Sequence, residues 1–322
     1  IMLIGIVAVI AAVLSGQGGF LEAIRKMAEI PSDLPVTMGQ PGAFTSFFGP
    51  DPWNLLGVII LTSLGTWGLP QMIGKFYAIK DEKSINTGTV ISTLFACIVA
   101  GGSYFLGGFG RLFDSSEIYD ETGSVVFDSI VPHMLSSLPD LLIGIVVVLV
   151  LSASMSTLAS LVLTSSSTLT LDFLKDNVMK NMSEKKQIRW MQFLVVFFIG
   201  LSVWIALDPS TFIAQLMGIS WGALAGAFLA PFLYGLYWKR VTRAAVWASF
   251  ITGVGITVSN LFLHYIASPI NAGAVAMIAG LVVVPLVSII TPKPDAKTVE
   301  QIFACYEETV TITKKRSLEA ER

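Results

Sequence analysis

The sequence predicts an all-α integral membrane protein, and two properties support that prediction. Hydrophobic residues make up 54% of the 322 residues and charged residues only 13%, with a mean hydropathy of +0.75. A soluble domain carries about 25% charged residues, so this chain has too little polar surface to cover soluble domains of its length. The apolar residues also fall into stretches of about 20, the length of helix that crosses a hydrocarbon core about 30 Å thick.

The apolar stretches follow one another along the whole chain. Backbone groups in lipid must be satisfied within the segment, so each stretch is expected to be a helix of a bundle. A partial span is expected at residues 1–15. Seven full spans are expected, at residues 53–74, 87–110, 140–173, 189–207, 211–237, 243–266 and 272–291. The domain organisation is then a membrane core, residues 1–292, and a charged C-terminal tail, residues 293–322.

The basic residues give the bundle an orientation. Successive connections between the expected spans lie on alternate sides of the membrane. One side then carries 3 Lys and Arg residues, and the other carries 17 of the 20 in the sequence. The positive-inside rule assigns the richer side to the cytoplasm. The protein is therefore expected in the plasma membrane with a cytoplasmic C-terminus. Two long connections, residues 16–52 and 111–139, lie outside, either as solvated links or as an external gate over a substrate path.

Several functional classes find no support in the residues. The net charge of −2 suggests no nucleic-acid partner. Cys97 and Cys305 are far apart, and His133 and His264 have no acidic or thiol residue at ligand spacing. No nucleophile lies at a useful spacing from a base, so the protein is not expected to be an enzyme.

A dense run of hydroxyl residues lies inside the 140–173 span. One face of a helix carries Ala153, Ser156, Thr157, Ser160 and Thr164, since the last four follow Ala153 by three, four, seven and eleven residues. Their neutral oxygens suit a hard cation such as Na⁺. The same residues are also typical of close helix packing in membranes, and the spacing alone leaves both interpretations open.

The 53–74 span contains residues that disfavour a continuous helix, at positions 65–71. Pro70 removes a backbone donor, and Gly65 and Gly68 flank it, so the sequence predicts either a broken helix or a simple kink. Half-helix ends at membrane depth present free N–H and C=O groups to a ligand. In the 211–237 span Gln215 is a lone amide, expected either to contact a ligand or to join in tight packing.

These segments resemble the sodium:solute symporter family, which includes proline, pantothenate and sodium–glucose symporters. The similarity covers residues 1–292, and residues 153–173 resemble the family's hydroxyl-rich helix that ends in an acidic–aromatic pair. In that helix a small residue and hydroxyl residues three and four positions later bind the coupling sodium. The resemblance therefore implies that Na⁺ is bound by the carbonyl of Ala153 and by the hydroxyls of Ser156 and Thr157.

A second motif resembles the part of the family that binds the substrate. Residues 67–71 and 75–80 are similar to the family's broken-helix motif and the basic cytoplasmic loop after it. Ser63, Thr66 and Trp67 fall where members contact or gate the solute. Sugar transporters place Asn and Tyr at the first two of these positions, which argues against a sugar. Proline transporters also place Tyr at the position of Thr66.

The resemblance implies a LeuT-type inverted-repeat helical bundle that works by alternating access. It also implies that the opening helices of the first repeat are missing from this chain, which begins inside an apolar run. The expected function is sodium-coupled import of a small organic solute: an amino acid such as proline, pantothenate or another small carboxylate. Its expected partners are that solute, Na⁺ and the lipid bilayer. Ser63, Thr66, Trp67 and Gln215 are expected to line the solute cavity.

Three other functions were weighed against symport. A symporter-like bundle can serve as a membrane sensory module, although the sequence after residue 291 contains no kinase motif. A channel would show a turnover rate far above that of a carrier. Proton coupling usually needs a carboxylate within the membrane, and the face at residues 153–164 offers none.

Overall fold

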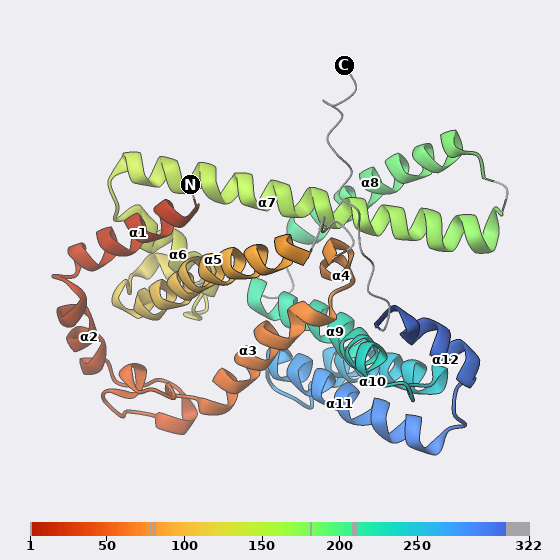
Figure 1. Cartoon of the computed structure of the whole chain (residues 1–322). Helices are drawn as coiled ribbons and strands as arrows, with labels where there is room; N and C mark the ends of the chain where they lie inside the picture. Colours follow the sequence, from red (N-terminus) through yellow and green to blue (C-terminus); the bar gives the residue numbers. More distant parts are fainter. Residues whose placement is uncertain (1, 77–78, 80–81, 181, 208–211, 307–322) are drawn as a thin grey trace. The chain divides into compact units, whose positions relative to one another are not determined.

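The computed structural model describes residues 2–76, 79, 82–180, 182–207 and 212–306 (Figure 1). These residues are helical apart from connections and one antiparallel bridge between Tyr119 and Val125. The chain forms two compact units. Unit 1 comprises Ile1–Ile59 and Pro70–Met217, and unit 2 comprises Ile60–Leu69 and Gly218–Arg322.

The long apolar stretches form helices, as the sequence predicts. Six helical segments are long and apolar enough to cross a membrane: Ser84–Leu112, Asp140–Val178, Glu184–Leu207, Ile213–Tyr237, Arg243–Leu263 and Pro269–Ile290. They correspond to six of the seven full spans expected. The seventh, residues 53–74, is not one helix, because it is broken near its middle. The expected partial span forms α1 (Met2–Gly16), which is bent by 63° against α2 (Phe20–Glu29).

Unit 1 contains most of the helices in the first two thirds of the chain. They are α1, α2, α4 (Pro70–Phe76), α5 (Glu82–Gly108), α6 (Phe127–Ser136), α7 (Asp140–Thr168) and α8 (Glu184–Leu207), with the first parts of α3 (Pro52–Gly65) and α9 (Ile213–Tyr237). Short segments connect them: η1 (Pro35–Thr37), η2 (Ala43–Thr45), η4 (Phe109–Leu112), η5 (Ser116–Ile118) and η6 (Leu169–Val178). Val9 and Val13 of α1 pack on Leu106 of α5 and on Met134, forming the main buried cluster of this unit.

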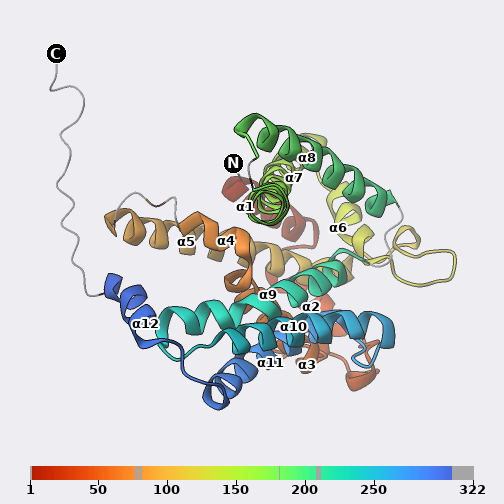
Figure 2. The same cartoon turned by 90° about the vertical axis from the view of Figure 1, so that its right-hand side faces the viewer.

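The apolar run from residue 140 is longer than a bilayer needs, and its expected continuation as a helix to about Lys175 is present. Beyond Thr168 the chain remains helical to Val178 as the π-helix η6. The wider turn of a π-helix changes which side chains face inward. Ser166 and Thr170 are fully buried at this junction, whereas Ser165 and Thr168 are exposed. The helix α8 then turns back and contacts α7 (Figure 2).

An arginine links the two long connections, residues 16–52 and 111–139. A guanidinium nitrogen of Arg111 lies 3.0 Å from a carboxylate oxygen of Asp33, and the guanidinium carbon lies 4.0 Å from the centre of the Phe44 ring. Residue 111 follows α5, whereas residues 33 and 44 belong to the 16–52 connection. These segments therefore fold back on the ends of the helices.

Unit 2 is a bundle of closely packed helices. It contains the rest of α3 and α9, η3 (Thr66–Gly68), α10 (Arg243–Leu263), α11 (Pro269–Ile290), α12 (Ala296–Phe303) and η7 (Ala304–Tyr306). A Cβ atom at Gly222 of α9 would lie 2.5 Å from the Cα atom of Gly273 of α11. Only glycine allows this backbone approach, which is typical of helix pairs in membranes. Of the expected tail, residues 307–322 lie outside the described residues.

Candidate functional site

The break predicted in the 53–74 span is present. The helix α3 ends at Gly65, one turn of 3₁₀-helix follows as η3, and Leu69 is extended with φ −85° and ψ 119°. The helix α4 then begins at Pro70. A proline disfavours helical geometry in the residue before it and suits the first position of a new helix. Pro70 therefore starts a second helix as well as ending the first.

The break packs directly on α9 within unit 2. Leu69 is 1% exposed. A Cβ atom at Gly68 would lie 2.7 Å from the Cα atom of Ala225 and 2.9 Å from the Cβ atom of Leu229. There is consequently no room for a side chain at Gly68, and the irregular backbone is fixed by packing against the neighbouring helix.

Three of the four expected solute-binding residues lie together at this break. The hydroxyl of Thr66 donates to the backbone carbonyl of Ser63 at 3.3 Å. Ser63 is exposed, Thr66 is half-buried and the Trp67 side chain is 60% exposed. The last carbonyls of a helix have no partner within it, so the end of α3 offers acceptors beside two hydroxyls and an aromatic surface. This combination suits a small polar solute that also carries apolar carbons.

The fourth expected residue, Gln215, is half-buried in the first turns of α9, in the part that belongs to unit 1. Ser63, Thr66 and Trp67 belong to unit 2, so a shared cavity with Gln215 stays a prediction. The basic stretch at residues 75–80 follows the break, and residues 77, 78 and 80 lie outside the described residues.

The expected sodium ligands occupy consecutive turns of α7 in unit 1. The hydroxyl of Thr157 donates to the carbonyl of Ala153 at 3.0 Å, so two of the three expected oxygens are adjacent. Ser156 and Thr157 are exposed and Ala153 is half-buried. Hard cations such as Ca²⁺ and Mg²⁺ take about six or more oxygen ligands. Three oxygens from one helix therefore supply part of a coordination shell, and the rest must come from another element.

Two of these residues line an open groove beside α7. The groove has a volume of about 730 Å³, and Ser152, Ala153 and Ser156 lie along it. Asp140 also lines it, about 24 Å from Ser156 along the helix at 1.5 Å per residue. In the part of the chain that the structure describes, no group of three His, Cys, Asp or Glu residues is placed to hold a metal ion. The oxygens beside Ser156 in this groove are those of hydroxyls and carbonyls, and the carboxylate of Asp140 lies at a distance along the helix.

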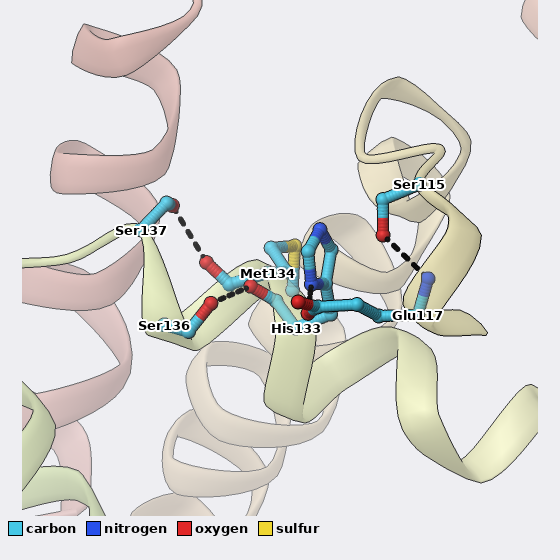
Figure 3. Close-up of polar contacts among 6 residues, drawn as sticks. All are labelled: Ser115, Glu117, His133, Met134, Ser136 and Ser137. Atoms are coloured by element: carbon cyan, nitrogen blue, oxygen red, sulfur yellow. Dashed lines mark hydrogen bonds and ion pairs between the residues drawn. The ribbon is translucent and has the colours of Figure 1, made fainter.

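The connection between α5 and α7 contains a contact between a histidine and a glutamate (Figure 3). The Nδ1 atom of His133 in α6 lies 3.1 Å from the Oε2 atom of Glu117 in η5. The hydroxyls of Ser136 and Ser137 donate to the carbonyls of His133 and Met134, each at 2.7 Å. The side chain of Met134 is fully buried in the apolar cluster of unit 1, while the side chain of His133 contacts η5.

A contact that sequence reasoning missed ties this connection to α9. The backbone N–H of Ile213 donates to the Oδ2 atom of Asp128 at 3.1 Å, and the rings of Phe127 and Phe212 are 5.0 Å apart. The first N–H groups of a helix lack partners within it, and a carboxylate is the favoured acceptor there. The acidic residue lies 85 positions before α9. No local sequence signal indicates such a pairing.

Comparisons with known proteins identify one family. Residues 1–253 match the model of the sodium:solute symporter family. The sodium/pantothenate symporter of Haemophilus influenzae is 28% identical over 291 residues, which cover 87% of this chain and 57% of that protein. The osmoregulated proline transporter of Bacillus subtilis is 27% identical over 253 residues, which cover 76% of this chain and 49% of that protein. The sodium/proline symporter of H. influenzae is 26% identical over 211 residues, which cover 60% of this chain and 40% of that protein. The chain spans about half the length of these relatives, which are transporters by name and not enzymes.

Proposed function

Because the chain belongs to the sodium:solute symporter family, we propose that it forms part of the core of a sodium-coupled symporter for a small organic solute. It is a multi-pass membrane protein, with several helices of spanning length and apolarity. The relatives described above are named for pantothenate and for proline. Both solutes carry a carboxylate, so the proposed class is an amino acid such as proline, pantothenate or another small carboxylate.

The broken helix at Thr66–Gly68 is the observation that carries this proposal. Irregular backbone at membrane depth is tolerated only inside protein or beside a water-filled cavity. Here its buried side packs on α9, while Trp67 faces away and is exposed. We assign Ser63, Thr66 and Trp67 to the solute cavity, with Gln215 joining them in at least one state of the transport cycle.

The coupling ion is assigned to α7. The carbonyl of Ala153 and the hydroxyls of Ser156 and Thr157 supply three neutral oxygens for Na⁺. The hydroxyl of Thr157 donates its hydrogen to Ala153, so its own lone pairs are left for the cation. Each charge that crosses 100 mV of membrane potential contributes about 2.3 kcal/mol to uptake, before any sodium gradient is added.

The proposed mechanism is alternating access in a LeuT-type inverted-repeat bundle. The division of the chain into two compact units supports a motion between rigid parts. The connection at residues 111–139, ordered by the Glu117–His133 pair, is assigned to an external gate. In this proposal residues 1–292 form the membrane core, and residues 293–322 form a cytoplasmic tail in the plasma membrane.

Solute uptake tests the proposal directly. The full-length protein is reconstituted in proteoliposomes, and uptake of labelled pantothenate, proline and related small carboxylates is measured with and without an inward Na⁺ gradient. Accumulation that requires Na⁺ supports symport. Uptake that is unaffected by Na⁺ would refute the coupling ion. No uptake of any such solute would favour the sensory module, which the transporter names of the relatives do not support.

A further inference from the structure

A basic cavity lies in unit 2, apart from the residues assigned to transport. It has a volume of about 370 Å³ and lies between the α9–α10 connection and the α11–α12 connection. Lys239, Arg240 and Lys293 line it, and Val299 and Glu300 of α12 complete it. We propose that this cavity binds the phosphate headgroup of an anionic phospholipid.

The charges around the cavity favour an anion. Two carboxylates lie on these connections and on α12, those of Asp295 and Glu300. The cations of the same segments, with the first residue of α10, are Lys239, Arg240, Arg243, Lys293 and Lys297. The ion pairs found among the described residues involve none of these cations. Asp295 is already engaged, since its Oδ2 atom accepts from the N–H and the hydroxyl of Thr298 at 3.0 and 2.8 Å.

The guanidinium group of Arg240 is held in place by α11. Its Nε atom donates to the carbonyl of Ser288 at 3.4 Å, and its Nη2 atom donates to the carbonyl of Ile289 at 2.9 Å. A guanidinium has five N–H donors, so three remain for a ligand. Arginine presents these donors in a planar fork that matches phosphate oxygens. An arginine held by two carbonyls beside two lysines is an arrangement suited to a phosphate group.

The two walls of the cavity are fastened to each other. The hydroxyls of Thr242 and Thr291 are 2.8 Å apart, which joins the two connections. The hydroxyl of Tyr306 donates to the carbonyl of Leu236 at 3.1 Å, which holds the end of α12 on α9. The Nζ atom of Lys239 lies 5.4 Å from the centre of the Phe303 ring. Specific side-chain contacts therefore hold the segments around the cavity together.

The position of the cavity favours a lipid as the source of the phosphate. It begins just beyond the ends of three helices of spanning length, α9, α10 and α11. Tyr237 and Trp247 at these ends are 77% and 65% exposed, and aromatic residues gather at membrane interfaces. Ile302 of α12 is 62% exposed although α12 also carries charged residues. Amphipathic helices of this kind lie in the headgroup region, where a lipid phosphate is present.

Binding of short-chain lipids to the purified chain tests this inference, and the test needs no transport activity. The chain in neutral detergent is titrated with dioctanoyl phosphatidylglycerol, and the apparent Kd of the first bound lipid is measured by native mass spectrometry. Lys239→Gln/Lys293→Gln is the test variant. Lys185→Gln/Lys186→Gln is the matched control, because it removes two exposed lysines from the start of α8, in unit 1.

The expected loss is about fivefold for each lysine removed from the cavity, or about twenty-fivefold for both. The control should bind like the parent chain, and Lys239→Arg/Lys293→Arg should retain binding, so a folding defect in the Gln variant does not decide the test. Equal losses in the test and control variants would overturn the proposal, as would unchanged binding in the test variant. Equally tight binding of dioctanoyl phosphatidylcholine would remove the preference for an anion. Equally tight binding of glycerol phosphate would assign the cavity to a soluble phosphate compound instead of a lipid.

Discussion

The backbone of Gly68 touches the backbone of Ala225, and this contact joins the broken helix to α9. A Cβ atom at residue 68 would lie 2.7 Å from both the Cα and Cβ atoms of Ala225. Gly68 and Leu69 are buried at this contact, whereas the side chain of Trp67, one residue earlier, is 60% exposed. The irregular segment thus combines a packed backbone with an exposed aromatic side chain.

The first prediction concerns this contact. Gly68→Ala should lower the free energy of unfolding by about 1–3 kcal/mol, because the added methyl group forces the break away from α9. Gly74→Ala is the control in α4, where an added Cβ atom meets nothing within 4 Å. Thermal unfolding in detergent measures both. A similar loss in the two variants would mean that crowding at Gly68 is not the cause.

The second prediction concerns the coupling ion. Thr157→Ala and Ser156→Ala should each weaken the apparent affinity for Na⁺ by about tenfold or more, since an interaction with a charged group contributes about 1.5–3 kcal/mol. Thr164→Ala is the control on the same face, because its hydroxyl also donates to a carbonyl four residues earlier, that of Ser160 at 2.8 Å. The Na⁺ dependence of initial uptake rates measures the effect. Unchanged Na⁺ dependence in the first two variants would refute the assignment to α7.

The third prediction concerns the solute. Trp67→Ala should raise KM by about three- to tenfold, the range expected for an aromatic contact of about 0.5–1.5 kcal/mol. The 60% exposure of Trp67 means that thermal stability should change little. Trp204→Ala, at a 72% exposed position of α8, is the control for loss of an exposed indole. If KM is unaffected at Trp67, that residue does not contact the solute.

The fourth prediction is a pH dependence at the start of α12. Hydrogen bonds from Thr298 lower the pKa of Asp295 below its ordinary value of 3.8. A lowered pKa in the folded state means that the carboxylate stabilises α12 fully above the ordinary value and loses this effect as the pH falls through the lowered value. Hydrogen exchange of α12 amides should therefore speed up as the pH falls below about 4, after correction for the intrinsic rate.

The control for this effect keeps the cap and removes the titration. Asparagine caps helices about as well as aspartate, so Asp295→Asn should retain the N-terminal bonds and show no such pH dependence. The same acceleration in both proteins would mean that another group is responsible.

The sequence was sufficient for most of the helices and for the break. Hydropathy located six spans, and Pro70 with its flanking glycines predicted the interruption that the structure contains. The helix from residue 140 was expected to continue past the membrane to about Lys175, and it ends at Val178. The start of the next helix was less well predicted: the apolar stretch begins at residue 189 and α8 begins at Glu184, since charged residues continue a helix beyond the apolar stretch. Hydropathy registers the membrane crossing and not the helix itself.

The candidate site could be predicted residue by residue but not as an arrangement. The adjacency of Ala153 and Thr157 follows from helical spacing, and a hydrogen bond joins them in the structure. The division that places Gln215 in a different unit from Trp67 depends on contacts between distant segments. The Arg111–Asp33 and Asp128–Ile213 contacts likewise join residues far apart in the chain. Spacing carries no information about such pairs.

The extended residue at the break also has a mechanical consequence. The chain passes between its two units after Ile59, after Leu69 and after Met217. The first and last of these points lie inside α3 and α9, where the hydrogen-bonded backbone bends but resists twisting. Leu69 alone of the three is outside a helix. Leu69 is therefore the one of these three crossing points where no helix constrains the backbone torsion angles, two residues from the exposed indole of Trp67.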